Sequence, residues 1–256
     1  MAKNNWTREE TIIAFNVYCK IQFKNSSKTN PTIIKYAKII GRSPSALNMK
    51  IGNFGRLDPE LKKRGITGLR NGSKLEEIIW NEFNGNWEEL AYESQRLIAM
   101  FENKTIEEVS DINLDDIEFP KGKERETIVK RRVNQSFFRS TILSSYNLKC
   151  AITGLPIPEL LVASHIVPWA KDKNNRLNPR NGICLNSIHD KAFDKGYLTI
   201  TIDYKVKVSP TLKAYNNDDS ISDLLLKYDN QKIILPDKFL PAKEFLDYHN
   251  TIIFKR

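Results

Sequence analysis

The chain has 256 residues, a formal net charge of +9 and 40% apolar residues. This length fits one large or two ordinary domains, and the apolar content is that of a folded globular protein, which excludes wholesale disorder. The positive charge favours a polyanionic partner, nucleic acid ahead of a membrane surface. The alternative is a set of solvated lysine faces that keep the protein soluble.

No apolar run approaches the length of a membrane span, and the opening MAKNNWTREE lacks the apolar core of a signal peptide. The three cysteines, Cys19, Cys150 and Cys184, include no CxxC pair, which argues against a disulfide framework and against a zinc ribbon. We therefore expect a reduced, cytoplasmic protein without a membrane segment.

The first fifty-odd residues predict three helices. Thr7 and Glu10 have the spacing of a capping box ahead of an apolar run. A second helix is expected between Asn30 and Gly41, and a third follows directly after a Ser-Pro pair. Two short helices joined at a glycine make residues 30–54 a helix-turn-helix pattern.

This stretch resembles the Myb/SANT-like three-helix domains through its WTREE opening and the GRSPSAL turn into its last helix. In that family the third helix enters the major groove, so the resemblance implies that side chains off the apolar stripe reach phosphates or base edges. The alternative is a helical packing unit with no role in DNA binding. The DNA contacts predicted here are Arg42, Asn48 and Lys50, with Ser45 beside them.

Two further helices are expected at 73–83 and 87–101. The acidic segment 103–122 is interpreted as a linker. The next stretch, KGKERETIVKRRVNQSFFRS, predicts a basic amphipathic helix whose charges are ordinarily a solvated face. The alternative is a phosphate-binding flank, with Arg131 and Arg139 as its DNA contacts.

The remaining sequence mixes strands and helices. ELLVASHIVPW and NGICLN predict strands, and SIHDKAFDKG predicts a short helix closed by a glycine. The other expected elements are a hairpin in 197–209, helices around 221–228 and 241–254, and a strand at 231–236.

Two of the three histidines lie in this mixed region with an asparagine between them. A strand ends in His165, Asn181 opens the second strand, and His189 opens a helix, which is the order of a ββα-metal nuclease site. Phosphodiester hydrolysis requires a base that activates water and a positive centre that neutralises the phosphate. A neutral imidazole suits the base role near physiological pH, and a second imidazole with a carboxylate can hold one divalent ion.

The run from Cys150 to Thr201 resembles the HNH endonucleases, in particular the branch of predicted restriction endonucleases with the signature ASHIxPW…NGIxLxxxHDxAFDxG. The resemblance extends over roughly the last 130 residues. It implies that His165 is the general base, that Asn181 orients this base or braces the loop, and that His189 binds the metal.

The sequence departs from the family at two metal positions. Ser164 stands where many HNH sites have a metal-binding His or Asp, and Phe193 stands where the second helix ligand usually lies. Asp194 is our candidate to complete the site, and Asp190, one helical turn earlier, is its competitor.

Each of these residues also has a structural interpretation. His165 can be a hydrogen-bonded strand histidine, Asn181 a turn former, and Asp194 a partner of a nearby lysine. We interpret His249 as a packing residue of the last helix. A different metal hypothesis groups Cys150, His165, Cys184 and His189 as a structural zinc site.

The sequence thus predicts an α+β protein, with an all-helical DNA-binding domain in 1–102, an acidic linker in 103–122 and an HNH nuclease domain in 123–256 that carries flanking helices and a small β-sheet. Its expected function is a metal-dependent endonuclease of restriction type that cuts foreign, including modified, double-stranded DNA. We expect one divalent ion, Mg²⁺ before Mn²⁺, Ni²⁺ or Zn²⁺. Arg180 is a further predicted DNA contact.

Double-strand cutting with one active site per chain favours a homodimer on a two-fold site. A partner methyltransferase is not indicated by any motif. Two other functions stay open: a non-catalytic DNA-binding regulator with a degenerate HNH fold, and a nuclease acting on RNA, although no RNA-recognition motif is evident.

Overall fold

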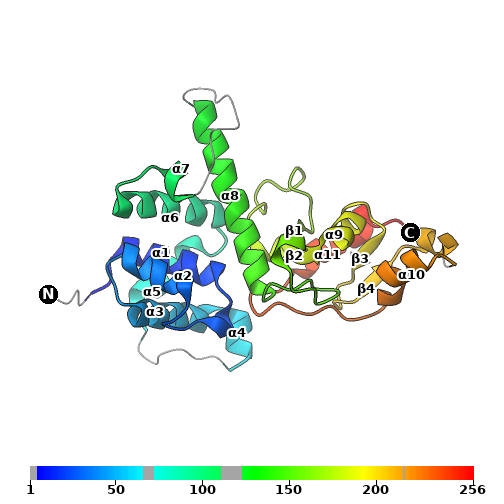
Figure 1. The fold of residues 1–256 in the computed structure, drawn as a ribbon, viewed down its shortest axis with the longest axis horizontal. Helices are drawn as coiled ribbons and strands as arrows, with labels where there is room; N and C mark the ends of the chain where they lie inside the picture. The colour runs from blue at the N-terminus through cyan, green and yellow to red at the C-terminus, as the bar shows by residue number, and fades with distance from the viewer. Residues whose placement is uncertain (1–4, 66–71, 111–122, 216) are drawn as a thin grey trace. The chain divides into compact units, whose positions relative to one another are not determined.

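The computed structural model describes residues 5–65, 72–110, 123–215 and 217–256. The chain folds into two compact units, Met1–Thr141 and Ile142–Arg256, and Figure 1 labels the elements of both. No helix among the described residues is both long and apolar enough to cross a bilayer. The helices of the first unit are α1 (Arg8–Lys20), α2 (Pro31–Ile39), α3 (Pro44–Leu57), α4 (Pro59–Lys63), α5 (Lys74–Phe83), α6 (Trp87–Glu102), α7 (Ile106–Val109) and most of α8 (Lys123–Ser145).

Helix α1 forms the centre of the first unit. It packs against α3, α5 and α6, and its residues from Glu10 to Cys19 are all buried. The predicted capping box is confirmed, because Thr7 Oγ1 accepts from the Glu10 amide at 3.3 Å and the Glu10 carboxylate accepts from the Thr7 amide at 3.0 Å. A helix buried on all sides needs little from intrinsic propensity, since packing supplies most of its stability.

Helices α2 and α3 are the two helices predicted in 30–54. Asn30 and Ser43 cap them, their side-chain oxygens accepting from first-turn amides at 2.9 and 3.2 Å. Gly41 between the helices has a φ of 66°, a conformation that a residue with a Cβ rarely adopts. The two predicted helices joined at a glycine are therefore present, and α2 packs against α3.

The segment predicted as an acidic linker, 103–122, begins with ordered structure. Thr105 caps the short helix α7 through a second capping box, and residues 111–122 lie outside the described part of the chain. The boundary between the compact units falls later, between Thr141 and Ile142 within α8.

The position of this boundary follows from what the start of α8 contacts. Arg125 pairs with Glu107 at 3.0 Å and Lys130 pairs with Glu88 at 3.1 Å, so this part of α8 belongs to the helical unit. The nuclease domain was expected to start at residue 123, but the second compact unit starts at Ile142. The two positions differ because α8 is one continuous helix that belongs to both units.

The second unit is built around two strands and a helix. Strand β1, Leu161–His165, pairs antiparallel with β2, Gly182–Asn186, and α9, Ser187–Asp194, packs against both. The three elements adjoin in Figure 1 as a ββα unit. The other elements are β3 (Leu198–Ile200) and β4 (Val206–Val208), which form a hairpin, with α10 (Asp219–Leu224) and α11 (Lys243–Tyr248), the latter continued by a π-helical turn, His249–Ile253.

Two of the expected strands were wrong in this unit, one in its bounds and one in its existence. The strand predicted over 159–169 is confined to β1, since the chain leaves the sheet directly after His165. The segment 231–236 is not a strand: it forms only an isolated bridge at Lys232. The Ile233 amide donates to the Tyr204 carbonyl, and the Ile234 amide donates to the Ala151 carbonyl. Because these acceptors belong to different segments, no continuous ladder of hydrogen bonds forms.

Candidate functional site

The end of β1 presents His165 at the mouth of a sixteen-residue connection to β2. His165 lies opposite Gly182 in the register, and it is the last residue of its strand. The following connection ends in a short 3₁₀ turn, Pro179–Asn181, that leads directly into β2. A strand terminus exposes side chains that the strand interior would bury, and the His165 side chain is accordingly only partly buried.

The His165 ring is held by a backbone carbonyl. Its Nε2 lies 2.8 Å from the carbonyl oxygen of Arg176, and since a carbonyl accepts, Nε2 must carry the hydrogen. In the neutral ring, Nδ1 therefore carries the lone pair. Burial lowers the pKa of His165, opposed by the Arg176 carbonyl and the charge of Asp190, so the ring is neutral near pH 7. Trp169 contacts it edge-on, with ring centroids 5.5 Å apart.

Asn181 clamps the connection that holds this ring. Its Oδ1 accepts from the Val167 amide at 2.8 Å, and its Nδ2 donates to the carbonyls of Val167 and Asn175, both at 3.2 Å. Asn175 immediately precedes Arg176, whose carbonyl fixes His165. Of the two roles expected for Asn181, the geometry therefore favours bracing the loop, and Asn181 is connected to His165 through the backbone.

One carboxylate of α9, Asp190, lies near His165, and a second, Asp194, lies near Asp190. Asp190 is close enough to His165 for each charge to affect the pKa of the other, and Asp194 follows one turn later on the same helical face. Burial raises the pKa of Asp190, and burial together with repulsion from Asp190 raises the pKa of Asp194. Two carboxylates that disfavour each other's charge are poised to accept a cation.

Ser164 completes this group. Its hydroxyl is buried and makes no hydrogen bond of good geometry within the described residues, yet it lies close enough to Asp190 to lower the pKa of that carboxyl. A buried hydroxyl without a full partner costs free energy unless a ligand or water satisfies it. Ser164 is therefore a buried hydroxyl beside the Asp190 carboxylate.

His189, the predicted metal ligand, points elsewhere. Its side chain is buried, Nε2 donates to the Leu224 carbonyl at 2.7 Å, and Nδ1 lies 3.3 Å from the amide nitrogen of Asn186. The Tyr228 ring meets it edge-on at 5.2 Å. Both ring nitrogens are engaged by protein groups, so the structure does not bring His189 together with Asp194 as a ligand pair. The residue is held inward because α9 turns its apolar face, with Phe193, toward the core.

The thiol of Cys150 belongs to the surroundings of His189. Burial raises the pKa of Cys150, but hydrogen bonds with His189 and Thr153 and with nearby backbone amides outweigh burial and bring it to about 7. The thiol also accepts from the Asn186 amide at 3.3 Å. This polar network connects Cys150 with the junction between β2 and α9, so we assign it a structural role.

No three His, Cys, Asp or Glu side chains cluster as a metal site anywhere in the described ranges. The zinc hypothesis that grouped Cys150, His165, Cys184 and His189 is wrong on this ground, and all three cysteines are buried free thiols. The oxygens of Ser164, Asp190 and Asp194 are the set that fits a divalent ion best. Oxygen donors with two carboxylates suit Mg²⁺ or Mn²⁺.

Two of the DNA contacts predicted in and just before α3 are paired with buried carboxylates. Arg42 pairs with Glu10 at 2.7 Å, and Lys50 pairs with Glu76 at 2.6 Å, with all four side chains less than a tenth exposed. Asn48 accepts from the Ser26 hydroxyl at 2.5 Å. Sequence spacing placed these residues off the apolar stripe, but buried acidic partners on α1 and α5 draw the two cations inward, which does not suit a phosphate contact.

The other predicted DNA contacts remain at the surface. Arg131 and Arg139 are exposed on α8, and Arg139 has a further protein contact. Arg180 is exposed one residue before Asn181, with Nε donating to the Leu240 carbonyl at 3.3 Å. Arg180 is thus the predicted contact that lies nearest in the chain to the His165 loop.

Sequence reasoning did not find the carbonyl of Arg176 or the hydrogen bonds that Thr153 makes with the Cys150 thiol. Neither has a recognisable pattern, because a backbone carbonyl is common to every residue and only the loop path selects one. The sequence named Asp190 as a competitor of Asp194 for the metal, and Ser164 as a departure from the usual metal-binding residue. The signal for grouping the two carboxylates was the one-turn spacing from Asp190 to Asp194.

Comparison with known protein families gives a match in the region around His165. Residues 150–201 match the model of a family described as HNH endonuclease, a segment that contains β1, β2, α9 and the His165 loop. The match covers about a fifth of the chain. No curated protein matches the chain. Residues 150–201 therefore have the character of an HNH endonuclease domain, and DNA hydrolysis is the activity that such a domain suggests.

Proposed function

We propose that the protein is a metal-dependent endonuclease that cuts double-stranded DNA, as a restriction-type enzyme acting on foreign and modified DNA. The observation that carries the proposal is the His165 imidazole, fixed in one tautomer at a strand end and lying beside the Asp190 carboxylate. The match of residues 150–201 to the HNH family supports the same chemistry.

In the proposed reaction His165 is the general base. Because Nε2 donates to the Arg176 carbonyl, Nδ1 accepts a proton from a water molecule. The water oxygen then bonds to phosphorus, and the bond from phosphorus to the 3′ oxygen breaks as that oxygen takes up a proton. The Arg176 carbonyl stays hydrogen-bonded to the ring and stabilises the imidazolium that forms.

Asn181 is a positioning residue in this scheme. Its three hydrogen bonds fix the connection on both sides of Arg176, so the ring keeps its orientation while the proton moves. Removing this amide changes the orientation of the base without removing the base.

Ser164, Asp190 and Asp194 would hold the divalent ion. When bound, the ion neutralises charge on the phosphate and the leaving oxygen. The carboxylates need such a partner because burial and mutual repulsion raise their pKa values, and no ion pair of 4 Å or less involves either within the described residues. This ligand set replaces the predicted one, in which His189 accompanied Asp194.

Exposed basic side chains near the site support DNA as the substrate. Lys171 and Lys173 are exposed on the His165 loop, and Arg180 is exposed at its end. Such side chains bind phosphates without reading sequence. We propose further that two copies act together on one duplex. Light scattering of the protein–DNA complex should then give the mass of two protein chains per duplex.

The test is nicking of supercoiled plasmid with Mg²⁺ or Mn²⁺, using plain, methylated and hydroxymethylated DNA side by side. We expect His165→Ala to reduce the cleavage rate by about 10²- to 10⁴-fold, the range that general bases contribute. Chelation with EDTA should abolish cleavage, and fresh Mg²⁺ or Mn²⁺ should restore it.

Asp203→Asn is the matched control, since Asp203 is an exposed carboxylate of the β3–β4 turn in the same unit. It should cut like wild type. If neither wild type nor any variant nicks any of the three DNAs, while all bind DNA with strong salt dependence, the protein is a DNA-binding regulator and the nuclease proposal fails.

A further inference from the structure

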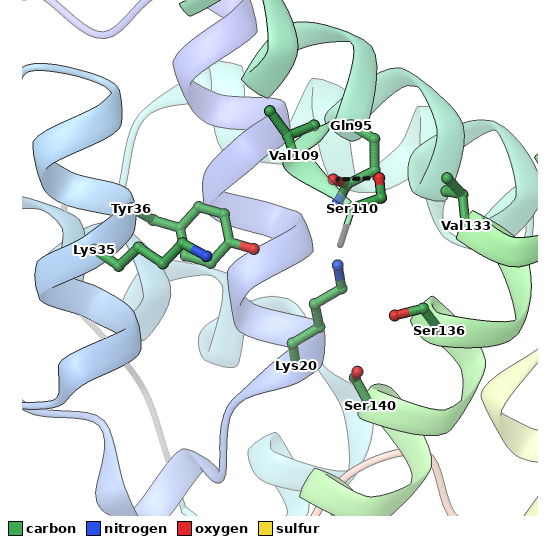
Figure 2. Close-up of a pocket in the computed structure, with 9 residues that line it drawn as sticks. All are labelled: Lys20, Lys35, Tyr36, Gln95, Val109, Ser110, Val133, Ser136 and Ser140. Carbon is green, nitrogen blue, oxygen red and sulfur yellow. Dashed lines mark hydrogen bonds between the residues drawn. The ribbon is translucent and has the colours of Figure 1, made fainter. Parts of the chain in front are cut away.

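A recess of about 160 Å³ lies among the helices of the first unit. Side chains of α1, α2, α6 and α8, together with residues at the end of α7, line it. Figure 2 shows Lys20 of α1 reaching into the space, with the side chains of the other helices around it. The proposed nuclease chemistry uses none of these residues.

The lining is cationic. Lys20 and Lys35 contribute two ammonium groups, and no Asp or Glu is among the lining residues. In the parts of the chain that the structure describes, neither lysine forms an ion pair within 4 Å. This contrasts with Arg42 and Lys50 of the same unit, which both have carboxylate partners.

Lys20 is the inner of the two cations. Its side chain is only partly exposed, and its Nζ lies 5.8 Å from the centre of the Phe137 ring. Burial, together with the nearby charge of Lys35, lowers the pKa of Lys20 to about 8. Holding an ammonium group away from water without a counter-charge is unfavourable, so an anion in the recess would stabilise the charged form.

The neutral groups of the recess are hydrogen-bond donors. Gln95 uses its amide oxygen to accept from the Ser110 hydroxyl at 3.3 Å, drawn as the dashed line in Figure 2, so its NH₂ group is what it can offer a ligand. Ser136 and Ser140, one turn apart on α8, direct their hydroxyls toward the Lys20 side of the space in Figure 2. Neutral donors therefore approach from α6 and α8, in addition to the lysines of α1 and α2.

We propose that this recess binds the terminal phosphoryl group of a nucleotide or of a 5′-phosphorylated DNA end. A phosphoryl group brings negative charge and three acceptor oxygens, which matches two ammonium groups and several converging donors. A volume of about 160 Å³ equals that of roughly five liquid waters, enough for a phosphoryl group but not for a whole nucleotide. The sugar and base would stay outside.

The geometry favours a monoester over a backbone diester. A phosphodiester must admit the chain on both sides of its phosphorus, whereas a terminal phosphoryl group enters by one end. Lys35 and Tyr36 sit on α2 at the more exposed part of the lining, where they can contact the first groups beyond the phosphate.

The test measures binding to the full chain by calorimetry, without divalent ions so that no cleavage occurs. The probes are inorganic phosphate, deoxyadenosine 5′-monophosphate, deoxyadenosine, and one oligonucleotide with either a 5′-phosphate or a 5′-hydroxyl. We expect phosphate and the monophosphate to bind and deoxyadenosine not to bind. Lys20→Met should weaken binding by at least about tenfold, the loss of one charged hydrogen bond.

Lys38→Met is the matched control, because Lys38 is exposed on α2 and is not part of the lining. It should bind as wild type does. A 5′-phosphate that strengthens oligonucleotide binding, an effect lost in Lys20→Met, identifies the DNA end as the source; binding of the free nucleotide alone identifies a small-molecule ligand. Equal binding of deoxyadenosine and its monophosphate, or no binding of any phosphate at millimolar concentration, overturns the proposal.

Two further measurements do not depend on the Lys20 variant. Ser136→Ala combined with Ser140→Ala leaves both lysines in place and should weaken phosphate binding several-fold. In the wild type, affinity should fall as the pH rises through about 8, because Lys20 loses its proton there. The titratable groups around Lys20 are Cys19 on its own helix and Lys35 and Tyr36 of α2, while Gln95, Ser110, Ser136 and Ser140 of the other elements do not titrate in this range. Affinity that is unaffected by both changes would contradict the assignment.

Discussion

The helical unit and the HNH-type region, residues 150–201, differ in how their charged side chains are paired. In the helical unit Arg42 and Lys50 lie against Glu10 and Glu76, and the Tyr18 hydroxyl donates to Asp58 at 2.6 Å. In the HNH-type region, Asp190 and Asp194 have raised pKa values, and no carboxylate–cation pair shorter than 4 Å occurs among its residues, all of which the structure describes.

The difference indicates where selection for stability and selection for chemistry act. A buried ion pair fixes how helices pack, and breaking it is costly because one charge is left behind. Carboxylates without a cationic partner contribute little to stability and leave charge to interact with a ligand. Lys20 is the exception in the helical unit, which is why its recess is the proposed second binding site.

The largest effect should come from Asp190→Asn, which removes charge from the cluster that would hold the ion. We expect cleavage to fall on the order of 10³-fold, the several kcal/mol that a bound cation contributes. The free energy of unfolding should stay equal or rise, because burial disfavours the charged carboxylate. Plasmid nicking and urea denaturation measure the two quantities. A variant that loses both stability and activity would show that Asp190 stabilises the fold, as the buried ion pairs of the helical unit do.

Lys50→Met tests the opposite class of charge. It leaves Glu76 buried without its ammonium partner and should lower the free energy of unfolding by about 3–5 kcal/mol. Adding Glu76→Gln should recover most of this loss, since glutamine still accepts from Asn53, whose amide lies 2.9 Å from the Glu76 carboxylate. Lys38→Met serves as the exposed control and should change stability by less than about 0.5 kcal/mol. Equal effects of the two lysine variants would contradict the comparison.

His249 provides a pH-dependent contribution from the second unit. Its ring stacks on Phe193 at 3.6 Å, Nε2 donates to the Phe193 carbonyl at 3.2 Å and Nδ1 accepts from the Thr199 hydroxyl at 2.7 Å. Burial lowers its pKa from 6.5 to about 4. The unfolded chain therefore binds the proton more strongly, and stability is lost as the pH falls from about 6.5 toward 4, by roughly 3 kcal/mol for this group.

The measurement is urea denaturation across this pH window for wild type and His249→Asn. The difference between their pH slopes isolates the contribution of His249 from that of other groups. Parallel slopes would show that the ring is not held in its neutral form.

Asn181→Ala should have a moderate effect on folding and a distinct effect on catalysis. It leaves the Val167 amide and two carbonyls without their partner, a loss of about 1–3 kcal/mol. Because Asn181 acts through the loop on His165, kcat should fall while KM is kept. Asn181→Asp retains the acceptor for Val167 but not the donors, and should also lose kcat. Full activity in Asn181→Asp would show that the donors to the loop carbonyls do not position the base.

Local signals in the sequence determined most of the helix starts. The capping residues Thr7, Asn30 and Ser43 satisfy amides of their own first turns, and Gly41 adopts its turn conformation because it has no Cβ. The order of strand, loop, strand and helix around His165 was also predictable, since apolar periodicity and the HNH-like signature both lie within one continuous run.

Tertiary structure decided what each polar side chain contacts. No local pattern shows that Lys50 meets Glu76 or that the His189 ring meets the Leu224 carbonyl, because these partners are 26 and 35 positions apart in the chain. The same holds for the Arg176 carbonyl that fixes the tautomer of His165. Sequence thus determined which polar residue types stand at the ends of β1, β2 and α9, whereas the folded path of the backbone decided which atom or group each of them contacts.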